Sequence, residues 1–466
     1  MDKINQINLN NNKISHIDVL VAEIGSTTTV VNAFNGIGTS SPSFVGQGQA
    51  PTSVLEGDVN IGLNGAIEDL KRNIAADNLT WNDMLATSSA AGGLKMTVHG
   101  LVYDMTVRAA KEAALGAGGI IKMVTSGKLR RLDLKKIQEV NPNIILVAGG
   151  VDYGERETAL NNLEMILSMG LKTPIIYAGN IENQDEVKLM CEEADVQLYI
   201  VENVYPKIDT LVVEPTRKVI QDAFEEHIIH APGMSEVRKL VNGPIIPTPG
   251  AVMEAAKILK EDLGDLVIFD VGGATTDVHS VTAGSEEINR ILISPEPEAK
   301  RTVEGDLGVY VNANHVIEKI GVDELKKEFP DLDEIIASYN AIPKNDRERE
   351  FVERLTEEAV LTSLERHSGT MRNLYGPTGK KTVAEGKDLS AVRYIIGTGG
   401  ALTRLPNRES ILKKVAGYAK GLELFPTTSA KVMIDNDYIF ASLGVLSKKY
   451  PKDALILMKK SLDLAE

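Results

Sequence analysis

The sequence predicts an α/β protein made of two duplicated halves, and two segments carry that prediction. Residues 19–29 read VLVAEIGSTTT, and residues 266–276 read LVIFDVGGATT. Each is an apolar run followed by an acid, an apolar residue, a glycine, a turn rich in small hydroxyl residues and a β-branched run. The two segments lie about half a chain apart. A strand that ends in a carboxylate and turns through Gly and Thr suits phosphate and metal binding, so the repeat predicts two similar domains that hold one nucleotide between them.

The first half is expected over residues 17–245. A polar, Asn-rich lead at residues 1–16 precedes it, and we expect this lead to be disordered. Apolar runs predict strands, and apolar residues at helical spacing predict helices. The predicted strands are residues 17–24, 28–34, 44–47 and 84–91. The predicted helices are residues 55–74 and 106–115, the second of which opens with a Thr cap.

The sequence pattern changes at about residues 120–245. Its predicted strands, 144–148, 174–177 and 196–201, alternate with predicted helices at 157–169 and 182–193. Short connections of this kind are typical of parallel strands joined by crossover helices. We therefore expect an α/β insertion in the first half. Three prolines and two glycines at residues 241–250 mark the link to the second half.

The second half is expected over residues 246–466. It begins with a predicted helix at residues 251–263. Strands are predicted at residues 266–270, 278–281, 392–396 and 432–434. Residues 322–365 are highly charged and predicted to be helical, and residues 438–446 form a last helix that carries small residues.

Composition excludes several classes of function. The formal net charge is −15 and no basic stripe is present, so nucleic acid is not an expected partner. Cys191 is the single cysteine, which excludes an internal disulfide and a thiolate metal cluster. No run approaches the roughly 18 apolar residues of a membrane span, and the N-terminus lacks the apolar core of a signal peptide. We expect a cytoplasmic protein that does not bind membranes.

The two acids at the strand ends, Glu23 and Asp270, are the candidate catalytic and metal-binding residues. Carboxylates that face each other across a cleft can hold a hydrated Mg²⁺, which keeps several waters and takes few direct protein ligands. They can also orient the water that attacks a γ-phosphate. Either acid alone would more simply cap neighbouring amides, but the duplication favours the catalytic interpretation.

The turns after the two acids are candidate phosphate sites. Their backbone N–H groups and hydroxyls can point at phosphate oxygens, and glycine allows close approach. A plain hairpin turn is the alternative. The expected contacts are Gly25, Ser26, Thr27, Thr28, Gly272, Gly273, Ala274, Thr275, Thr276 and Asp277.

A third glycine-rich turn follows the predicted strand at residues 392–396. A strand that leads into such a turn and then a helix lets the backbone approach a flat ring or a ribose, although the same turn is often only structural. The expected cofactor contacts here are Gly397, Thr398, Gly399 and Gly400.

Four other signals are weaker. Residues 376–382 resemble a P-loop but lack the four-residue gap between glycines, so they predict a basic surface turn. His279 stands in an Asp-x-His sequence that is typical of cobalamin carriers, but the glycine expected three residues later is Thr282; a strand face is the better interpretation. His227 and His230 are a weak metal pair that more simply ends a solvated helix. Residues 344–358 predict a solvated helix face.

The three glycine-rich elements together resemble the actin-like ATPase superfamily, which has ribonuclease H-like domains. Its first phosphate motif matches residues 23–28, its second matches residues 270–276, and its adenosine motif matches residues 397–400. The Asp-x-Gly-Gly-x-Thr-Thr-Asp form of the second motif, residues 270–277, is specific. The first motif usually opens with Asp where this chain has Glu23, which leaves open whether Glu23 positions the attacking water.

The resemblance to one narrower family extends over nearly the whole chain. The sequence is similar to the glutamate (methylaspartate) mutase accessory proteins, labelled MutL, which are unrelated to the mismatch-repair protein of that label. The matching stretches are residues 22–28, 89–94, 149–152, 177–180, 270–280 and 304–308. The resemblance implies a helper ATPase that reactivates adenosylcobalamin-dependent glutamate mutase by releasing damaged cobalamin.

We therefore expect ATP or ADP with Mg²⁺ in a cleft between the halves, and adenosylcobalamin-dependent mutase subunits, expected to be those of glutamate mutase, as partner. The oligomeric state, including a homodimer, stays open. Three alternatives remain: a small-molecule kinase on the same fold with Asp277, Glu304 or Asp306 as base, a nucleotide-binding scaffold or switch with negligible turnover, and an amidohydrolase of the hydantoin type.

Overall fold

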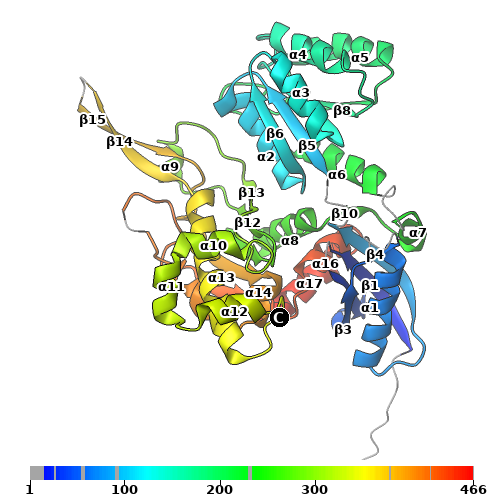
Figure 1. The fold of residues 1–466 in the computed structure, drawn as a ribbon. Helices are drawn as coiled ribbons and strands as arrows, with labels where there is room; N and C mark the ends of the chain where they lie inside the picture. The colour runs from blue at the N-terminus through cyan, green and yellow to red at the C-terminus, as the bar shows by residue number, and fades with distance from the viewer. Residues whose placement is uncertain are drawn as a thin grey trace, which may run out of the picture.

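In the part of the chain that the structure describes, three five-stranded sheets are each accompanied by helices (Figure 1). The computed structural model describes residues 15–25, 28–53, 58–89, 94–228, 234–376, 379–419 and 421–464. In Figure 1 the third sheet lies at the top, and the two other sheets lie below it on opposite sides of a group of helices.

The first sheet has the order β3-β2-β1-β4-β10. Within it β2 is antiparallel to both neighbours, while β1, β4 and β10 are parallel. The strands are β1 (His16–Ile24), β2 (Thr28–Asn35), β3 (Ser43–Pro51), β4 (Thr80–Ser88) and β10 (Ile245–Pro247). Helix α1 (Val59–Asn73) packs on β2 and β3, and α7 (Met234–Leu240) packs on α1. Asp58 caps α1 by accepting a hydrogen bond from the backbone N–H of Asn60.

The second sheet repeats this design. Its order is β13-β12-β11-β16-β17, and β12 again runs antiparallel to both neighbours while β11, β16 and β17 are parallel. The strands are β11 (Leu266–Val271), β12 (Thr276–Val281), β13 (Ala299–Glu304), β16 (Tyr394–Thr398) and β17 (Lys431–Ile434). Since strand order and direction both match, the two sheets are structural repeats.

Helices of the second half cover its sheet and extend away from the first half. They are α9 (Glu286–Asn289), α10 (Ala313–Ile320), α11 (Val322–Glu328), α12 (Leu332–Ser338), α13 (Asp346–His367), α14 (Gly399–Arg404) and α15 (Arg408–Lys413). The charged stretch at 322–365 is thus three helices. The expected solvated face at 344–358 is wrong in part, because Phe351, Val352 and Leu355 of α13 are buried in the core.

The third sheet is entirely parallel, in the order β6-β5-β7-β8-β9. Its strands are β5 (Lys95–Gly100), β6 (Ile120–Ser126), β7 (Ile144–Val147), β8 (Ile175–Tyr177) and β9 (Leu198–Ile200). Its helical segments are η3 (Tyr103–Val107), α2 (Arg108–Gly116), α3 (Arg131–Val140), α4 (Glu157–Leu167), η4 (Ile181–Asn183), α5 (Gln184–Glu193) and α6 (Glu214–Ile228). The sequence places the insertion from about residue 120, whereas this sheet takes its first strand from Lys95–Gly100.

One local expectation, the Thr cap on the helix expected at residues 106–115, is wrong. Thr106 does not cap α2. It lies in the π-helical turn η3, and its hydroxyl accepts hydrogen bonds from the N–H groups of Leu101 and Val102, which precede that turn. A two-stranded hairpin, β14 (Thr370–Gly376) and β15 (Gly379–Glu385), occupies the P-loop-like stretch and protrudes from the second half (Figure 1). Residues 1–14 and 90–91, and His230, lie outside the described residues.

The two halves meet through three helices, α8 (Thr248–Leu263), α16 (Phe440–Leu446) and α17 (Pro451–Ser461). One buried apolar cluster contains residues of α8 and α16 together with Val19 and Val21 of β1 and Ile268 of β11. These helices therefore join the two repeated sheets through a continuous core.

Candidate functional site

Both repeated sheets carry the same tight hairpin at the end of their first strand. Gly25 N–H donates to the Thr28 carbonyl (3.0 Å), and Gly272 N–H donates to the Thr275 carbonyl (2.9 Å). A Cβ on Gly25 would lie 2.5 Å from the Thr28 carbonyl oxygen, so the first turn requires glycine. The expected contacts Ser26 and Thr27 lie outside the described residues.

The second hairpin presents free backbone donors. The N–H groups of Gly273, Ala274 and Thr275 donate no hydrogen bond to any residue that the structure describes. The Gly273 carbonyl, in contrast, accepts from the N–H groups of Tyr310 (2.9 Å) and Val311 (2.7 Å). A loop of the second half thus holds the carbonyl side of the turn. Consecutive free N–H groups in such a turn form an anion-binding nest.

Glu23 lies at the contact between the halves. It is buried, and its Oε1 accepts hydrogen bonds from the Ser442 hydroxyl on α16 (2.5 Å) and the Asn32 side chain on β2 (3.3 Å). Burial raises the pKa of Glu23 to about 7, and the nearby Asp435 carboxylate adds to this increase, while the bond from Ser442 opposes it. The acid of the first repeat is therefore in direct contact with the second half.

Asp270, the acid of the second repeat, lies close to Glu23. Burial raises the pKa of Asp270 to about 7, and the negative charges of Asp277, Glu23 and Asp435 add to the increase. Gly399 completes the cluster: it adopts a φ of +83°, and a Cβ there would lie 2.4 Å from Asp270 Oδ1. All three sequence elements therefore converge at one place.

Two residues that the sequence pattern did not single out also belong to this cluster. Asp435 is buried, accepts from the N–H groups of Ile439 and Phe440 at the start of α16, and accepts from the Thr398 hydroxyl (2.9 Å). Tyr438 has a φ of 56°, which an aromatic residue rarely adopts. Burial raises the pKa of Tyr438 strongly, and Asp270 and Glu23 add to it. An acid just before an expected helix could have indicated Asp435; no sequence signal marks Tyr438.

Asp277 is engaged within the second sheet. Its Oδ1 forms an ion pair with Arg301 of β13 (2.5 Å), and both side chains are buried. Its Oδ2 accepts from the Thr275 hydroxyl (3.2 Å). Arg301 also donates to the Leu115 carbonyl of α2 (3.0 Å). Asp277 therefore fixes the base of the turn and connects it to the third sheet's helix.

The other acids considered as a kinase base are also paired. Arg366 forms hydrogen-bonded ion pairs with Glu304 (2.7 Å) and Asp306 (2.7 Å). The bond from Arg366 lowers the pKa of Asp306. A carboxylate held in this way is a poor proton acceptor, so these contacts do not favour the kinase interpretation.

The remaining expected contacts lie around the cluster in different roles. The Thr276 hydroxyl is buried and donates to the Leu307 carbonyl (2.6 Å). Gly397 lies in β16, where a Cβ would be 2.6 Å from Leu412 Cδ1. Gly400 faces open space at the start of α14. Within the third element, Gly399 is packed against Asp270 and Val271, and Gly400 is the residue with open space beside it.

Helices α8 and α16 cross very closely next to this cluster. A Cβ on Gly444 of α16 would lie 1.8 Å from the Ala251 carbonyl oxygen of α8. Ser442, which contacts Glu23, is two residues before Gly444 on the same helix. A change in the angle between the halves therefore moves the site and the helix crossing together.

The residues present fit a magnesium nucleotide. Mutually repelling carboxylates and free turn amides are suited to a cation and to phosphate oxygens respectively. Over the described part of the chain, no group of three or more His, Cys, Asp or Glu side chains could hold a metal ion directly. None of the helices in the described ranges is long and apolar enough to cross a membrane.

Two sheets of this order, joined by crossing helices and with acid-tipped hairpins that meet, define a protein with the actin-like ATPase fold. The sequence profile described as "MutL protein" matches residues 19–462. The chain belongs to this family. "Protein MutL" of Clostridium tetanomorphum is 38% identical over 464 residues, which cover 95% of this chain and 98% of that protein.

Solved structures show more distant likeness. A nucleotide-free acetone carboxylase gives a TM-score of 0.42 at 13% identity and covers 92% of this chain and 70% of its own. A glycerol dehydratase reactivase gives 0.34 at 12% identity, covering 92% and 99%. The ethanolamine utilization protein EutJ from Carboxydothermus hydrogenoformans gives 0.29 at 11% identity, covering 94% and 88%. None of these likenesses assigns a function to this chain.

Proposed function

We propose that this chain binds and hydrolyses Mg-ATP between its two halves, and that it is an accessory protein that reactivates an adenosylcobalamin-dependent mutase. The observation that carries the nucleotide site is the convergence of Glu23, Asp270 and Gly399, which come from three separate elements. The family supports the accessory role. The resemblance to glutamate mutase accessory proteins makes glutamate mutase the proposed partner.

In this proposal different residues of the chain bind the phosphates, the adenosine and the magnesium ion. The free amides of Gly273, Ala274 and Thr275 bind phosphate oxygens, and Gly399 and Gly400 lie against the adenosine. Magnesium, when bound, neutralises charge on the transferred phosphate. Asp270 would hold the hydrated magnesium ion and orient the attacking water, and Glu23 would do the same from the other half.

Glu23 can serve in this role although the related motif usually has Asp. Its side chain is held by Ser442 and Asn32, so the longer arm is fixed rather than free. Because Ser442 belongs to α16, closure of the halves on a nucleotide would change the surroundings of Glu23. Hydrolysis would therefore alter the closure of the cleft, a hinge-type transition.

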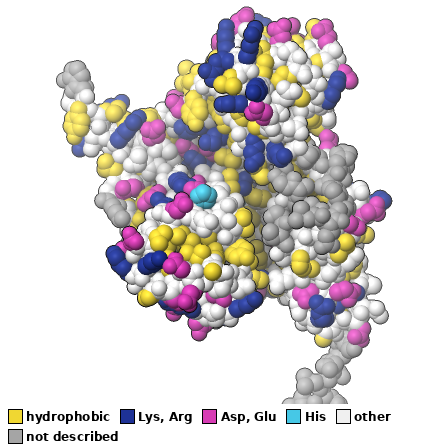
Figure 2. Space-filling view, viewed as in Figure 1, with side chains coloured by type: hydrophobic (Ala, Val, Ile, Leu, Met, Phe, Trp, Pro, Cys, Tyr) yellow, Lys and Arg dark blue, Asp and Glu magenta, His cyan; other side chains and the backbone are white. Residues whose placement is uncertain are grey.

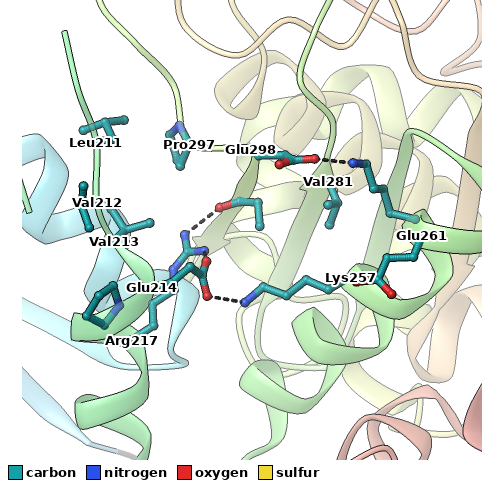
Figure 3. Close-up of a pocket in the computed structure, with 13 residues that line it drawn as sticks. Leu211, Val212, Val213, Glu214, Arg217, Lys257, Glu261, Val281, Pro297 and Glu298 are labelled. Carbon is teal, nitrogen blue, oxygen red and sulfur yellow. Dashed lines mark hydrogen bonds and ion pairs between the residues drawn. The ribbon is translucent and has the colours of Figure 1, made fainter. Parts of the chain in front are cut away.

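A second contact region could transmit closure to the third sheet (Figure 3). Arg217 of α6 donates to the Ala299 carbonyl of β13 (2.6 Å), and Glu214 of α6 pairs with Lys257 of α8 (2.7 Å). Lys260 of α8 pairs with Glu298. These contacts border a cavity of about 520 Å³ between α6, α8 and β13, whose lining combines apolar and charged side chains. Since α8 also crosses α16, we propose that the third sheet follows the hinge and presents the change to the partner protein.

The first experiment measures ATP hydrolysis by the purified chain without an acceptor. Asp270→Asn should abolish phosphate release while the circular dichroism spectrum stays unchanged. Asp265→Asn is the matched control, because Asp265 immediately precedes the other end of β11 and accepts from Thr282 there. Unchanged turnover in Asp270→Asn would refute the site. ATP loss only with a sugar or carboxylic acid would instead show a kinase.

The second experiment tests the partner. Glutamate mutase inactivated with cyanocobalamin is incubated with the chain, ATP and fresh adenosylcobalamin. The proposal predicts recovery of mutase activity that requires ATP and fails with Asp270→Asn. Hydrolysis without any recovery would leave an ATPase with a different partner and would refute the accessory role for this mutase.

A further inference from the structure

The third sheet ends in an edge strand, β6, whose outer edge pairs with no strand in the described chain. β6 bonds on one side to β5, and its ends are fixed there by Ile120 N–H to the Leu94 carbonyl and by Gly127 N–H to the Gly100 carbonyl. An open edge of this kind exposes backbone N–H and C=O groups that can pair with another extended chain.

A groove runs beside β6. Two adjoining cavities of about 570 and 250 Å³ lie between β6 and α3, and they share Met123 and Lys136. Residues 122–126 form one wall, and α3 with the segment before it forms the other. Thr125 and Ser126 add hydroxyl groups to the lining of the larger cavity, whereas Met123 and Val140 make the smaller cavity more apolar.

The groove is basic in an acidic protein. Residues 120–140 contain six Lys or Arg and two acids, whereas the whole chain has a net charge of −15. Both acids already have partners, Asp133 with an arginine at 3.1 Å and Glu139 with a lysine at 3.8 Å. Lys122, Lys128 and Lys136 are exposed and form no ion pair with the described residues. Figure 2 shows Lys and Arg gathered over this part of the third sheet.

We propose that β6 and this groove are the docking site for an extended acidic segment of a partner protein, which adds to the sheet as a sixth strand. Main-chain hydrogen bonds to the open edge would supply affinity, and the groove would supply specificity, as in other β-augmentation complexes. The three unpaired lysines select for carboxylates on the incoming strand.

The same lysines argue against a second copy of this chain as the occupant. Lys122 lies on β6, while Lys128 and Lys136 line the groove beside it, so two copies joined at this edge would bring two basic surfaces together. Lysines on an edge also protect it from aggregation. If the lysines served only to prevent aggregation, the edge would bind no acidic strand. Binding of an acidic strand therefore distinguishes docking from protection against aggregation.

The test uses the full-length chain and a fluorescein-labelled peptide, Thr-Glu-Val-Glu-Val-Glu-Val-Glu-Thr, followed by fluorescence anisotropy. One control peptide has the same charge but a central proline, which cannot pair as a strand. A second has lysine in place of glutamate. The proposal predicts saturable binding of the first peptide alone, with slower hydrogen exchange of the amides at residues 120–127.

Two charge-reversal variants locate the binding. Lys128→Glu with Lys136→Glu reverses two groove lysines and should weaken binding by about tenfold or more. Arg131→Glu with Lys135→Glu makes the same charge change on the same segment, but neither residue lines the groove, so we expect less than about a twofold effect. Asp270→Asn should leave binding unchanged, which separates this site from the nucleotide cleft.

Four results would overturn the proposal. Absence of binding would show that the edge is only protected. Equal binding of the strand-forming and proline-interrupted peptides, or equal loss in the two double variants, would show charge attraction without docking. Exchange protection elsewhere than at β6 would place the site on another surface.

Discussion

Gly444→Ala is expected to force apart the two helices that join the halves. The added Cβ would lie 1.8 Å from the Ala251 carbonyl oxygen, whereas ordinary contact begins at 3.4 Å, so α8 and α16 must separate by about 1.6 Å. Overpacking of this kind costs about 1–3 kcal/mol. The movement is also transmitted to Ser442 and hence to Glu23, so Mg-ATP affinity should fall.

Urea unfolding followed by circular dichroism measures the first effect, and calorimetric titration with Mg-ATP measures the second. Gly400→Ala is the matched control for the unfolding measurement alone, since Gly400 belongs to the proposed nucleotide site. A Cβ there meets nothing within 4 Å, and the residue is also helical. Its stability should rise by about 0.5–1 kcal/mol, the usual gain of Ala over Gly in a helix. If the Gly444→Ala and Gly400→Ala variants had the same free energy of unfolding, α8 and α16 would not be in tight contact at Gly444.

Two further predictions concern charge. Mg-ATP binding needs ionised Glu23 and Asp270, whose pKa values are both raised to about 7, so affinity should fall by about tenfold per pH unit and per carboxylate below pH 7. The folded, nucleotide-free chain holds these protons more tightly than the unfolded chain, so its free energy of unfolding should decrease from about pH 4 to about pH 7. Calorimetry and urea titrations across this range check both signs, with Asp270→Asn correcting for titration of the nucleotide; flat profiles would contradict them. Arg301→Met leaves Asp277 buried without its ion-pair partner and should lower the free energy of unfolding in urea by about 3–5 kcal/mol. Arg366 is more exposed, so Arg366→Met should lower it by less than about 1 kcal/mol. Equal losses in the two variants would contradict the buried position of the Arg301–Asp277 pair.

The hairpins at Gly25 and Gly272 could be predicted because their signals are local. An apolar run, an acid and a glycine turn are enough to specify a strand and its antiparallel partner. Their repetition allowed the further expectation that Glu23 and Asp270 meet, and the structure has them close enough to raise the pKa of Asp270.

The partners of these acids could not be predicted, because they come from the far end of the chain. Ser442 reaches Glu23 across 419 residues, and its position on a small-residue helix looks like ordinary packing. Glu353 was expected on a solvated face, but Asn407 holds it through its backbone and side chain. The sequence did not predict β5, because its lysine, threonine and histidine interrupt the apolar run that usually indicates a strand. The strand becomes evident only from its pairing with its parallel neighbours.

A double-mutant cycle on Mg-ATP binding tests the central claim most directly. Glu23→Gln, Asp270→Asn and the double variant are titrated with Mg-ATP by calorimetry, and the coupling free energy is taken from the four affinities. If both carboxylates act on one triphosphate, the losses are not additive, and the coupling should be about 0.5–3 kcal/mol. Additive losses, or full affinity in either single variant, would show that the two acids do not share a nucleotide.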